Sequence, residues 1–310
     1  MKKFLASAGV ICCSFITLAA NWVYDSSAKT LTRGSVVVSN VTYNAKNLTI
    51  GDNRTNPLAT DLDFSVAIDD DYVLKNINGA AFNGNTHVQT LITPTTLTWI
   101  GNNAFSSCTG LTKLRLADGL TEVQQQCFSS CTALSDWDNK LPSTLTLGGK
   151  EMFLSCSSLN GEVIIPEAYT ASYNCMFRGT GISKIKFTKT TTITGYACFH
   201  SMPNLTVFDL PETLTTLGAE RIFGDWGNHI AVTIYWRSCP TSFASNLYTG
   251  TNSGVITHYM PWRCKSEWDA FAETNTALTM PTTFDGTGTW ASQIVKWWND
   301  KPNGLRISIR

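Results

Sequence analysis

Ten cysteines and four histidines are the side chains of this 310-residue sequence best suited to nucleophilic, redox or metal chemistry. Thiolates and imidazoles act together when short spacings such as C-x-x-C or H-E-x-x-H bring them close. Neither spacing occurs, and the histidines are scattered at His87, His200, His229 and His258. The sequence also lacks a glycine-rich phosphate loop and a G-x-S-x-G motif. We therefore predict no catalytic residue, no metal site and no cofactor, and the protein is not expected to be an enzyme.

An acidic run at Asp69, Asp70 and Asp71 is the remaining candidate for chemistry. Three adjacent carboxylates could hold a cation or act as an acid pair. The more common meaning of such a run is a solvated edge that discourages strand pairing, and we favour that interpretation.

Charge and composition exclude one class of function. The chain has 23 basic and 23 acidic residues, and without Lys2 and Lys3 it has 21 against 23, a net charge of −2. Nucleic-acid binding depends on a basic patch that neutralises phosphates. No such excess exists, so nucleic acid is excluded as a partner.

The first 20 residues resemble an export signal. Lys2 and Lys3 form a basic region, residues 4–18 are apolar, and Ala19 and Ala20 are small residues suited to cleavage. The apolar run is shorter than the ~20 residues that span a bilayer, so we predict a signal peptide and no transmembrane segment. The expected location is secreted or at the cell surface.

A fixed repeat organises the rest of the chain. FSSCTGL at 105–111 returns as FSSCTAL at 128–134, and the surrounding pattern recurs every 22–25 residues. Units this small cannot bury their own apolar face, so they must stack into a solenoid with one shared interior. The predicted structural core is the column formed by Phe82, Phe105, Phe128, Phe153, Phe177, Phe199 and Phe223.

Each repeat also contains a strand signal. Polar and apolar residues alternate in LTKLRL (111–116), ISKIKF (182–187) and LTVFDL (205–210). We expect these strands to pair in parallel, about 4.8 Å apart, from one coil to the next.

The pattern L-P-x-x-L-T-x-I-G-x-x-A-F-x-x-C-x-x-L, found over residues 66–235, resembles the BspA-like leucine-rich repeat. HYMPWRCKSEWDAF, near the C-terminus, resembles the segment that often ends such arrays. The resemblance implies a repeat solenoid of the leucine-rich-repeat type, α/β horseshoe-like and β-rich, with parallel strands and capped ends. It also implies an exported surface protein that binds other proteins or cells.

The expected domain plan follows from where the repeat begins and ends. After the signal peptide (1–20) come an N-terminal β-rich cap (21–65), about seven coils of 22–25 residues (66–235), and a C-terminal cap with short helices (236–310). Ser266 and Asp269 form a capping-box pattern that predicts one helix. The spacing of Trp290, Ile294 and Trp297 is helical as well.

The cysteines of the mature chain divide into two groups. Cys108, Cys131 and Cys156 occupy an inward column, where a free thiol behaves as a small buried hydrophobe. Cys127 and Cys198 directly precede a phenylalanine and Cys175 lies two residues before one, and we expect packing roles for them too. Cys239 and Cys264 lie outside the regular array and are the candidate disulfide.

Charged residues at the outward strand positions are the candidate partner-binding residues. Their signs group by coil, and neighbouring coils are mostly complementary, so they could act as a register-fixing ladder. Alternatively they form a polar docking stripe on the solenoid surface. These residues are Lys113, Arg115, Asp136, Asp138, Lys184, Lys186 and Asp209.

Two functions fit these features. The first is a non-catalytic recognition or adhesion protein that binds proteins or cell-surface components through the solenoid. The alternative is a carbohydrate-binding or carbohydrate-processing protein that uses tryptophan platforms, because aromatic faces suit sugar rings. Coplanar exposed indoles would favour glycans and buried indoles would favour a cap, and the tryptophans concerned are Trp226, Trp236, Trp262, Trp268, Trp290, Trp297 and Trp298.

Overall fold

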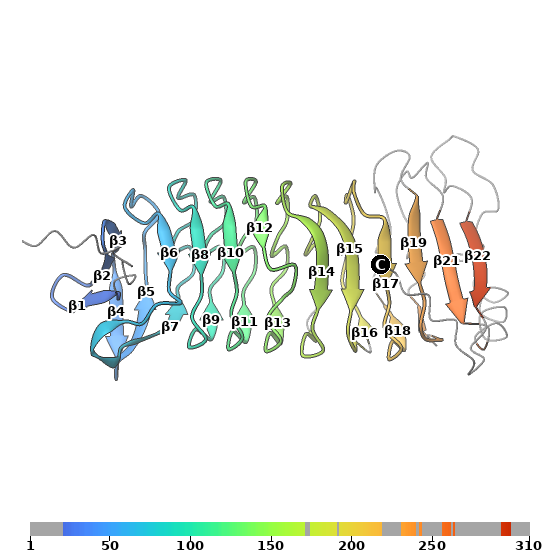
Figure 1. Cartoon of the computed structure of the whole chain (residues 1–310), viewed down its shortest axis with the longest axis horizontal. Coiled ribbons are helices and arrows are strands. Elements are labelled where there is room, and N and C mark those ends of the chain that lie inside the picture. The colour runs from blue at the N-terminus through green and yellow to red at the C-terminus, as the bar shows by residue number, and fades with distance from the viewer. Residues whose placement is uncertain are drawn as a thin grey trace, which may run out of the picture.

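The computed structural model describes residues 21–170, 174–190, 192–218, 231–239, 242–243, 256–261, 263 and 293–298. Within this part of the chain the protein is an elongated β-solenoid whose coils follow one another along the long axis (Figure 1). Each coil has two short strands and a tight turn that carries the repeated phenylalanine. The parallel stacking predicted from the alternating segments is confirmed.

One strand from each coil forms the first strand row (Figure 1). Two parallel sheets, ordered β12-β10-β8-β6 and β14-β15-β17-β19-β21-β22, meet at an isolated parallel bridge between Lys140 and Ile164. The row consists of β6 (Asp61–Asp63), β8 (Thr90–Ile92), β10 (Lys113–Arg115), β12 (Asp136–Trp137), β14 (Asn160–Ile165), β15 (Gly181–Phe187), β17 (Val207–Asp209), β19 (Val232–Tyr235), β21 (Ile256–Pro261) and β22 (Gln293–Trp298).

The second strand row lies across the core from the first. Its sheets are ordered β13-β11-β9-β7-β5-β4 and β16-β18-β20, and all pairs beyond the β4–β5 hairpin are parallel. The strands are β4 (Val41–Asn44), β5 (Asn47–Ile50), β7 (Val73–Ile77), β9 (Trp99–Ile100), β11 (Glu122–Val123), β13 (Leu147–Gly148), β16 (Thr192–Ile193), β18 (Thr216–Leu217) and β20 (Ser242–Phe243).

The third side of each coil is a phenylalanine turn with its own hydrogen-bond ladder. The N–H of Phe105 donates to the carbonyl of Cys127 at 2.8 Å, and the N–H of Phe128 donates to that of Met152 at 2.9 Å. The second residue after each phenylalanine has a left-handed backbone, which favours small or turn-forming residues. Glycine or serine therefore recurs there, as Gly84, Ser107, Ser130, Ser155, Gly179 and Ser201.

The phenylalanine rings form the centre of the core. Consecutive rings from Phe82 to Phe199 are stacked, with centroids 4.9–6.4 Å apart and planes within 6–13° of parallel. All six rings are fully buried. These separations fall in the range of favourable offset stacking. Phe223, the seventh member of the predicted column, lies outside the described residues.

The cysteine column is held by its thiols as well as by packing. The Sγ–H groups of Cys108, Cys131 and Cys156 donate to the carbonyls of the phenylalanines one coil earlier, at 3.0–3.2 Å. Burial raises the pKa of the Cys108 thiol to about 12. All six described cysteines of the array are free, including Cys127, Cys175 and Cys198.

Asn85 occupies the cysteine position of the first coil. Its Nδ2 group donates to the carbonyls of Asn53 and Asn56 at 2.7 and 2.9 Å, and its side chain is buried. The amide thus reaches the segment that precedes the array, which a thiol is too short to do.

The N-terminal segment, which precedes the first coil, contains short antiparallel strands. β1 (Val23–Asp25), β2 (Thr30–Arg33) and β3 (Val36–Val38) form a three-stranded sheet. Trp22 is fully buried, stacks on Phe64 at 4.8 Å, and donates from Nε1 to the carbonyl of Asp63. The acidic run forms the short 3-10 helix η1 (Asp69–Asp71).

Two predictions about helices need correction or stay untested. No α-helix occurs in the described residues, so the α/β horseshoe-like description is not supported there. The helix predicted around Trp290 to Trp298 is wrong for residues 293–298, which form β22 and pair with β21 in parallel. Apolar spacing over a short segment does not by itself distinguish a helix from a strand of a stacked sheet. The capping box at Ser266 lies outside the described residues.

Replacement of Phe128 by alanine should lower the free energy of unfolding by about 3–5 kcal/mol, because it removes a ring packed between two others. Urea denaturation followed by circular dichroism measures the change. Leu147→Ala is the matched control, since Leu147 is 50% exposed and its loss should cost less than about 0.5 kcal/mol. Equal shifts for the two variants would contradict the stacked column.

The buried thiols should be unreactive until the protein unfolds. Thiolate is the reactive species, and the raised pKa of Cys108 keeps that thiol protonated at pH 8. A chromogenic disulfide reagent at pH 8 should label none of the six array cysteines in native protein and all six in denaturant. Rapid native labelling of Cys108 or Cys131, located by mass spectrometry, would refute the hydrogen-bonded column.

Candidate binding surface

The charged residues predicted to face outward lie on or beside the first strand row. Parallel pairing brings charges of neighbouring coils next to each other, because it aligns Lys113 with Asp136 and Glu162 with Lys184. The candidates come from β10, β12 and the residue after it, β15 and β17: Lys113, Arg115, Asp136, Asp138, Lys184, Lys186 and Asp209.

Arg115 joins two coils. It forms ion pairs with Asp136 and, from Nε, with Oδ1 of Asp138 at 2.9 Å, and it donates from Nη1 to the carbonyls of Leu114 and Asp136. The guanidinium side chain is 28% exposed. Its donors are largely used within the protein, so Arg115 and the two aspartates act mainly as a clamp between β10 and β12.

A second ladder pair joins β14 to β15. Nζ of Lys184 lies 3.2 Å from Oε2 of Glu162, with both side chains about one-third exposed. Partly exposed pairs of this kind contribute up to about 1 kcal/mol. Lys184 therefore helps to keep neighbouring coils in register.

The alternation of the strand predicted that Asp209 faces solvent, and this prediction is wrong. The Asp209 side chain is 8% exposed and forms a two-point ion pair with Arg237, at 2.6 Å to Nε and 3.1 Å to Nη2. Hydrogen bonding to Asp209 raises the pKa of Arg237. Sequence reasoning missed Arg237, although it follows Tyr235, the register partner of Asp209, by two residues and so shares its face.

Five of the candidate charges are thus engaged between coils, and two lysines are not. Lys113 and Lys186 form no ion pair with any described residue, and Lys186 is exposed. In register with Lys186 lie Asp209, Tyr235 and Tyr259 on successive strands. We call these four positions the outer row.

The two tyrosines of the outer row form an aromatic pair that the sequence did not reveal. Their rings stack with centroids 5.1 Å apart and planes 19° from parallel. Burial raises the pKa of Tyr235, with a smaller contribution from Tyr259. Only the parallel register of β19 and β21 could have disclosed this pair, because the residues are 24 positions apart in sequence.

The tryptophan hypothesis can be tested at one position. Trp236 is fully buried and donates from Nε1 to Nδ1 of the buried His258 at 3.0 Å. It fills the core and presents no face to a ligand. The side chains of Trp226, Trp262, Trp268, Trp290, Trp297 and Trp298 lie outside the described residues.

The structure describes only one of the two cysteines of the candidate disulfide. Cys239 is disulfide-bonded, and Cys264, its expected partner, lies outside the described residues. The pairing of the two stays a prediction.

Two hollows among the described residues lie at the corner that follows the first strand row. One, of about 650 Å³, is near the N-terminal end. The other, of about 600 Å³, is bordered by Lys186, Asp209 and Arg237 at the outer row. Among the described residues, no cluster of three metal-ligating side chains occurs. No helix in that part of the chain has the length and hydrophobicity needed to cross a bilayer.

Stacked parallel coils with a phenylalanine turn define a β-rich leucine-rich-repeat solenoid. A family model described as "BspA type Leucine rich repeat region" matches six copies, over residues 65–160 and 138–235. The chain belongs to this family. No curated protein sequence matches it significantly.

Three solved structures resemble the chain. A T. pallidum leucine-rich repeat protein is 20% identical, with 70% of this chain and 83% of that one covered and a TM-score of 0.42. A Bacteroides ovatus leucine-rich repeat protein is 17% identical, with coverages of 86% and 78% and a TM-score of 0.44. A leucine-rich cell surface protein from Faecalibacterium prausnitzii is 17% identical, with coverages of 73% and 76% and a TM-score of 0.41. Identities this low concern the fold alone.

Arg237→Met should lower the free energy of unfolding by about 2–3 kcal/mol, because it leaves the buried carboxylate of Asp209 without its partner. The estimate is below that for a fully buried pair because Arg237 is one-third exposed. Lys189→Met is the control, since Lys189 and Glu167 are both more than 60% exposed and their pair should contribute little. In urea titrations, the double variant Asp209→Leu/Arg237→Met should recover part of the loss. A single variant as stable as the control would contradict this role.

Proposed function

We propose that this protein is an exported, non-catalytic recognition protein that binds other proteins through the outer row and its surroundings. The family is one of leucine-rich repeats, and such repeats generally serve protein binding through an extended surface. The predicted signal peptide agrees with a location outside the cytoplasm.

The observation that carries this proposal is the composition of the outer row. Lys186, exposed and without an ionic partner in the described part of the chain, lies in line with the Asp209–Arg237 pair and two stacked tyrosines. Tyrosine and arginine are enriched at binding hot spots, because they combine a large contact area with polar tips. The row is held by a parallel sheet, so a partner meets it with little loss of conformational freedom.

The same solenoid uses its apolar residues for stacking and several of its charges for pairs between coils. A catalytic site would need a nucleophile, a base and a group that orients them within one hollow. In the described part of the chain, the thiols of the array are buried and His258 is committed to Trp236. We therefore propose recognition and not catalysis, and no observation favours the carbohydrate alternative.

Lys186→Glu should slow association with a protein partner about 3- to 10-fold and reverse the salt dependence, because an exposed charge mainly steers encounter. The chain without residues 1–20 is passed over an immobilised panel of extracellular-matrix and epithelial-surface proteins, and surface plasmon resonance is recorded at 50 and 300 mM salt. Tyr235→Ala should accelerate dissociation from the same partner.

Lys150→Glu is the matched control. Lys150 is exposed but lies in the turn that leads to Phe153, away from the outer row. If it weakens binding as much as Lys186→Glu does, the contact lies elsewhere on the solenoid. Turnover of a polysaccharide or peptide that a single acidic or histidine substitution abolishes would overturn the non-catalytic proposal.

A further inference from the structure

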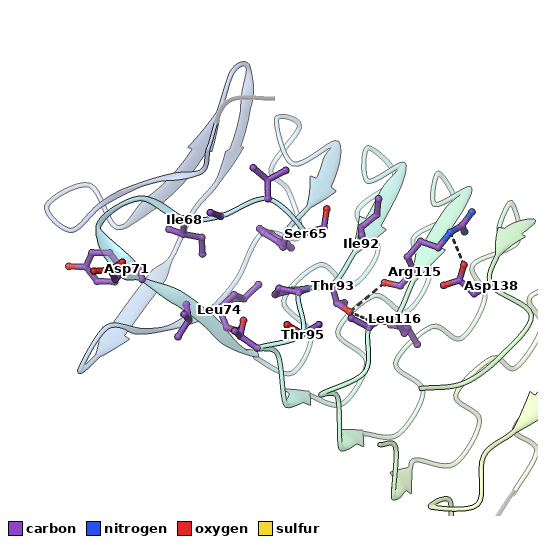
Figure 2. A pocket seen from close by; sticks show the side chains of 18 residues that line it. Ser65, Ile68, Asp71, Leu74, Ile92, Thr93, Thr95, Arg115, Leu116 and Asp138 are labelled. Atoms are coloured by element: carbon purple, nitrogen blue, oxygen red, sulfur yellow. Dashed lines mark hydrogen bonds and ion pairs between the residues drawn. The ribbon is translucent and has the colours of Figure 1, made fainter. Parts of the chain in front are cut away.

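The hollow near the N-terminal end is a groove created by a break in the repeat (Figure 2). The connection from β6 to β7 has nine residues (64–72), whereas those from β8 to β9 (93–98) and from β10 to β11 (116–121) have six each. The longer connection extends toward the N-terminal segment, where Ile68 forms an isolated parallel β-bridge with Trp22. It leaves a groove of about 650 Å³ between itself and the next two corners.

The groove is apolar along most of its walls. Its side chains come from the long connection, from β7, and from the ends of β8 and β10, and they include Phe64, Val66, Ile68, Leu74, Ile92 and Leu116. Val66, Ile68 and Leu116 are only partly buried and pack against the core from this side. Ligand sites typically enclose about 300–1,000 Å³ with mainly apolar walls and a few polar groups, and this groove fits that description.

The charge at the ends of the groove is negative. Asp71 lies at one end and Asp138 at the other, as Figure 2 shows, and Arg115 is the one cationic side chain in the lining. Arg115 is already neutralised by Asp136 and Asp138. Asp71 is exposed and forms no ion pair with any described residue. A ligand with a positive charge is therefore favoured over a neutral or anionic one.

Three tyrosines lie together at the Asp71 end of the groove, where Nζ of Lys46 also lies 5.6 Å from the Tyr72 ring centroid. Tyr72 lines the groove and contacts Tyr24 and Tyr43 edge to face, with centroids 5.0 and 6.0 Å away. Tyr43 is 55% exposed, although it is a large aromatic residue on a covering strand. The hydroxyls of Tyr43 and Tyr72 have no hydrogen-bond partner among the described residues, so they are available to a ligand.

The orientation of the three tyrosine rings distinguishes between a sugar and a peptide as the ligand. The three tyrosine planes lie 65–88° from one another, so no two offer the coplanar platform that suits consecutive sugar rings. The apolar walls also offer few partners for sugar hydroxyls. Perpendicular rings beside an apolar groove instead fit side chains that enter separately, as in peptide recognition.

We propose that this groove binds an extended peptide segment of a partner protein, with apolar side chains in the groove and a lysine or arginine near Asp71. Acidic and apolar features together select this class of sequence. The site is separate from the outer row, which lies several coils away along the solenoid (Figure 1). Binding at either site can thus be lost while the other is kept.

The test uses the chain without residues 1–20 and two sets of fluorescein-labelled nonapeptides. Both sets have alternating apolar residues; one carries a terminal lysine or arginine and the other a terminal glutamate. Fluorescence polarisation should detect the basic set at least tenfold more tightly than the acidic set. No binding of the basic set up to 1 mM, or equal binding of both, overturns the proposal.

Ala67→Trp should weaken binding of the basic peptides at least tenfold, because Ala67 is an exposed residue of the lining and an indole there fills the groove. Ala168→Trp is the matched control at the corresponding corner after β14, outside this groove, and should bind as the parent does. Unchanged melting of both variants shows that the fold is intact. Equal binding by the two variants overturns the assignment to this groove.

Asp71→Lys should reverse the preference, weakening the basic peptides and strengthening the acidic ones about 5- to 10-fold. Asp61→Lys, on the exposed face of β6 and outside the lining, serves as the charge control. If both substitutions act alike, general electrostatics explains the preference and the specific contact is wrong. If oligosaccharides compete with the peptides, and if Ala67→Trp abolishes oligosaccharide binding, the ligand of the groove is a glycan and the peptide proposal is wrong.

Discussion

Stacking of one phenylalanine ring on the ring of the next coil is the interaction on which the rest of the molecule depends. Each coil contributes one buried ring, worth roughly 1.5–3 kcal/mol, and the rings face each other only if the coils repeat with the same height and rotation. Carbonyls of the phenylalanine turn accept N–H groups of the preceding coil and cysteine thiols of the following coil. Ring stacking, the backbone hydrogen bonds and the thiol hydrogen bonds thus impose the same register. A coil displaced from this register would lose all three interactions.

This register decides what the surface can do. Parallel pairing aligns outward residues of neighbouring coils, so complementary charges close into pairs such as Arg115–Asp138 and Lys184–Glu162. Charges used in this way stabilise the array and have less to offer a partner. Two features stay available to a partner: Lys186, which has no ionic partner among the described residues, and the tyrosines brought together by β19 and β21.

The groove near the N-terminal end lies at an irregular connection of the solenoid. The connection between β6 and β7 has nine residues, against six in the corners after β8 and β10, and it borders the N-terminal groove. The two successive left-handed residues Asp70 and Asp71 in this connection are strained by about 1–3 kcal/mol each. Strain of this size persists only where surrounding contacts hold it, here the Trp22–Ile68 bridge and the Lys46 bond to the Asp70 carbonyl.

The sequence by itself determined the repeat, the phenylalanine and cysteine columns and the parallel strands, because identical residues at a fixed period can be satisfied only by identical stacked environments. It also implied complementary charges between coils. Tertiary structure alone decided that Asp209 turns inward to Arg237, that Tyr235 meets Tyr259, and that residues 293–298 form a strand. These outcomes depend on exact register and on the geometry of single corners. A repeat pattern describes what the coils have in common, so it does not specify the register or the corner geometry of one particular coil.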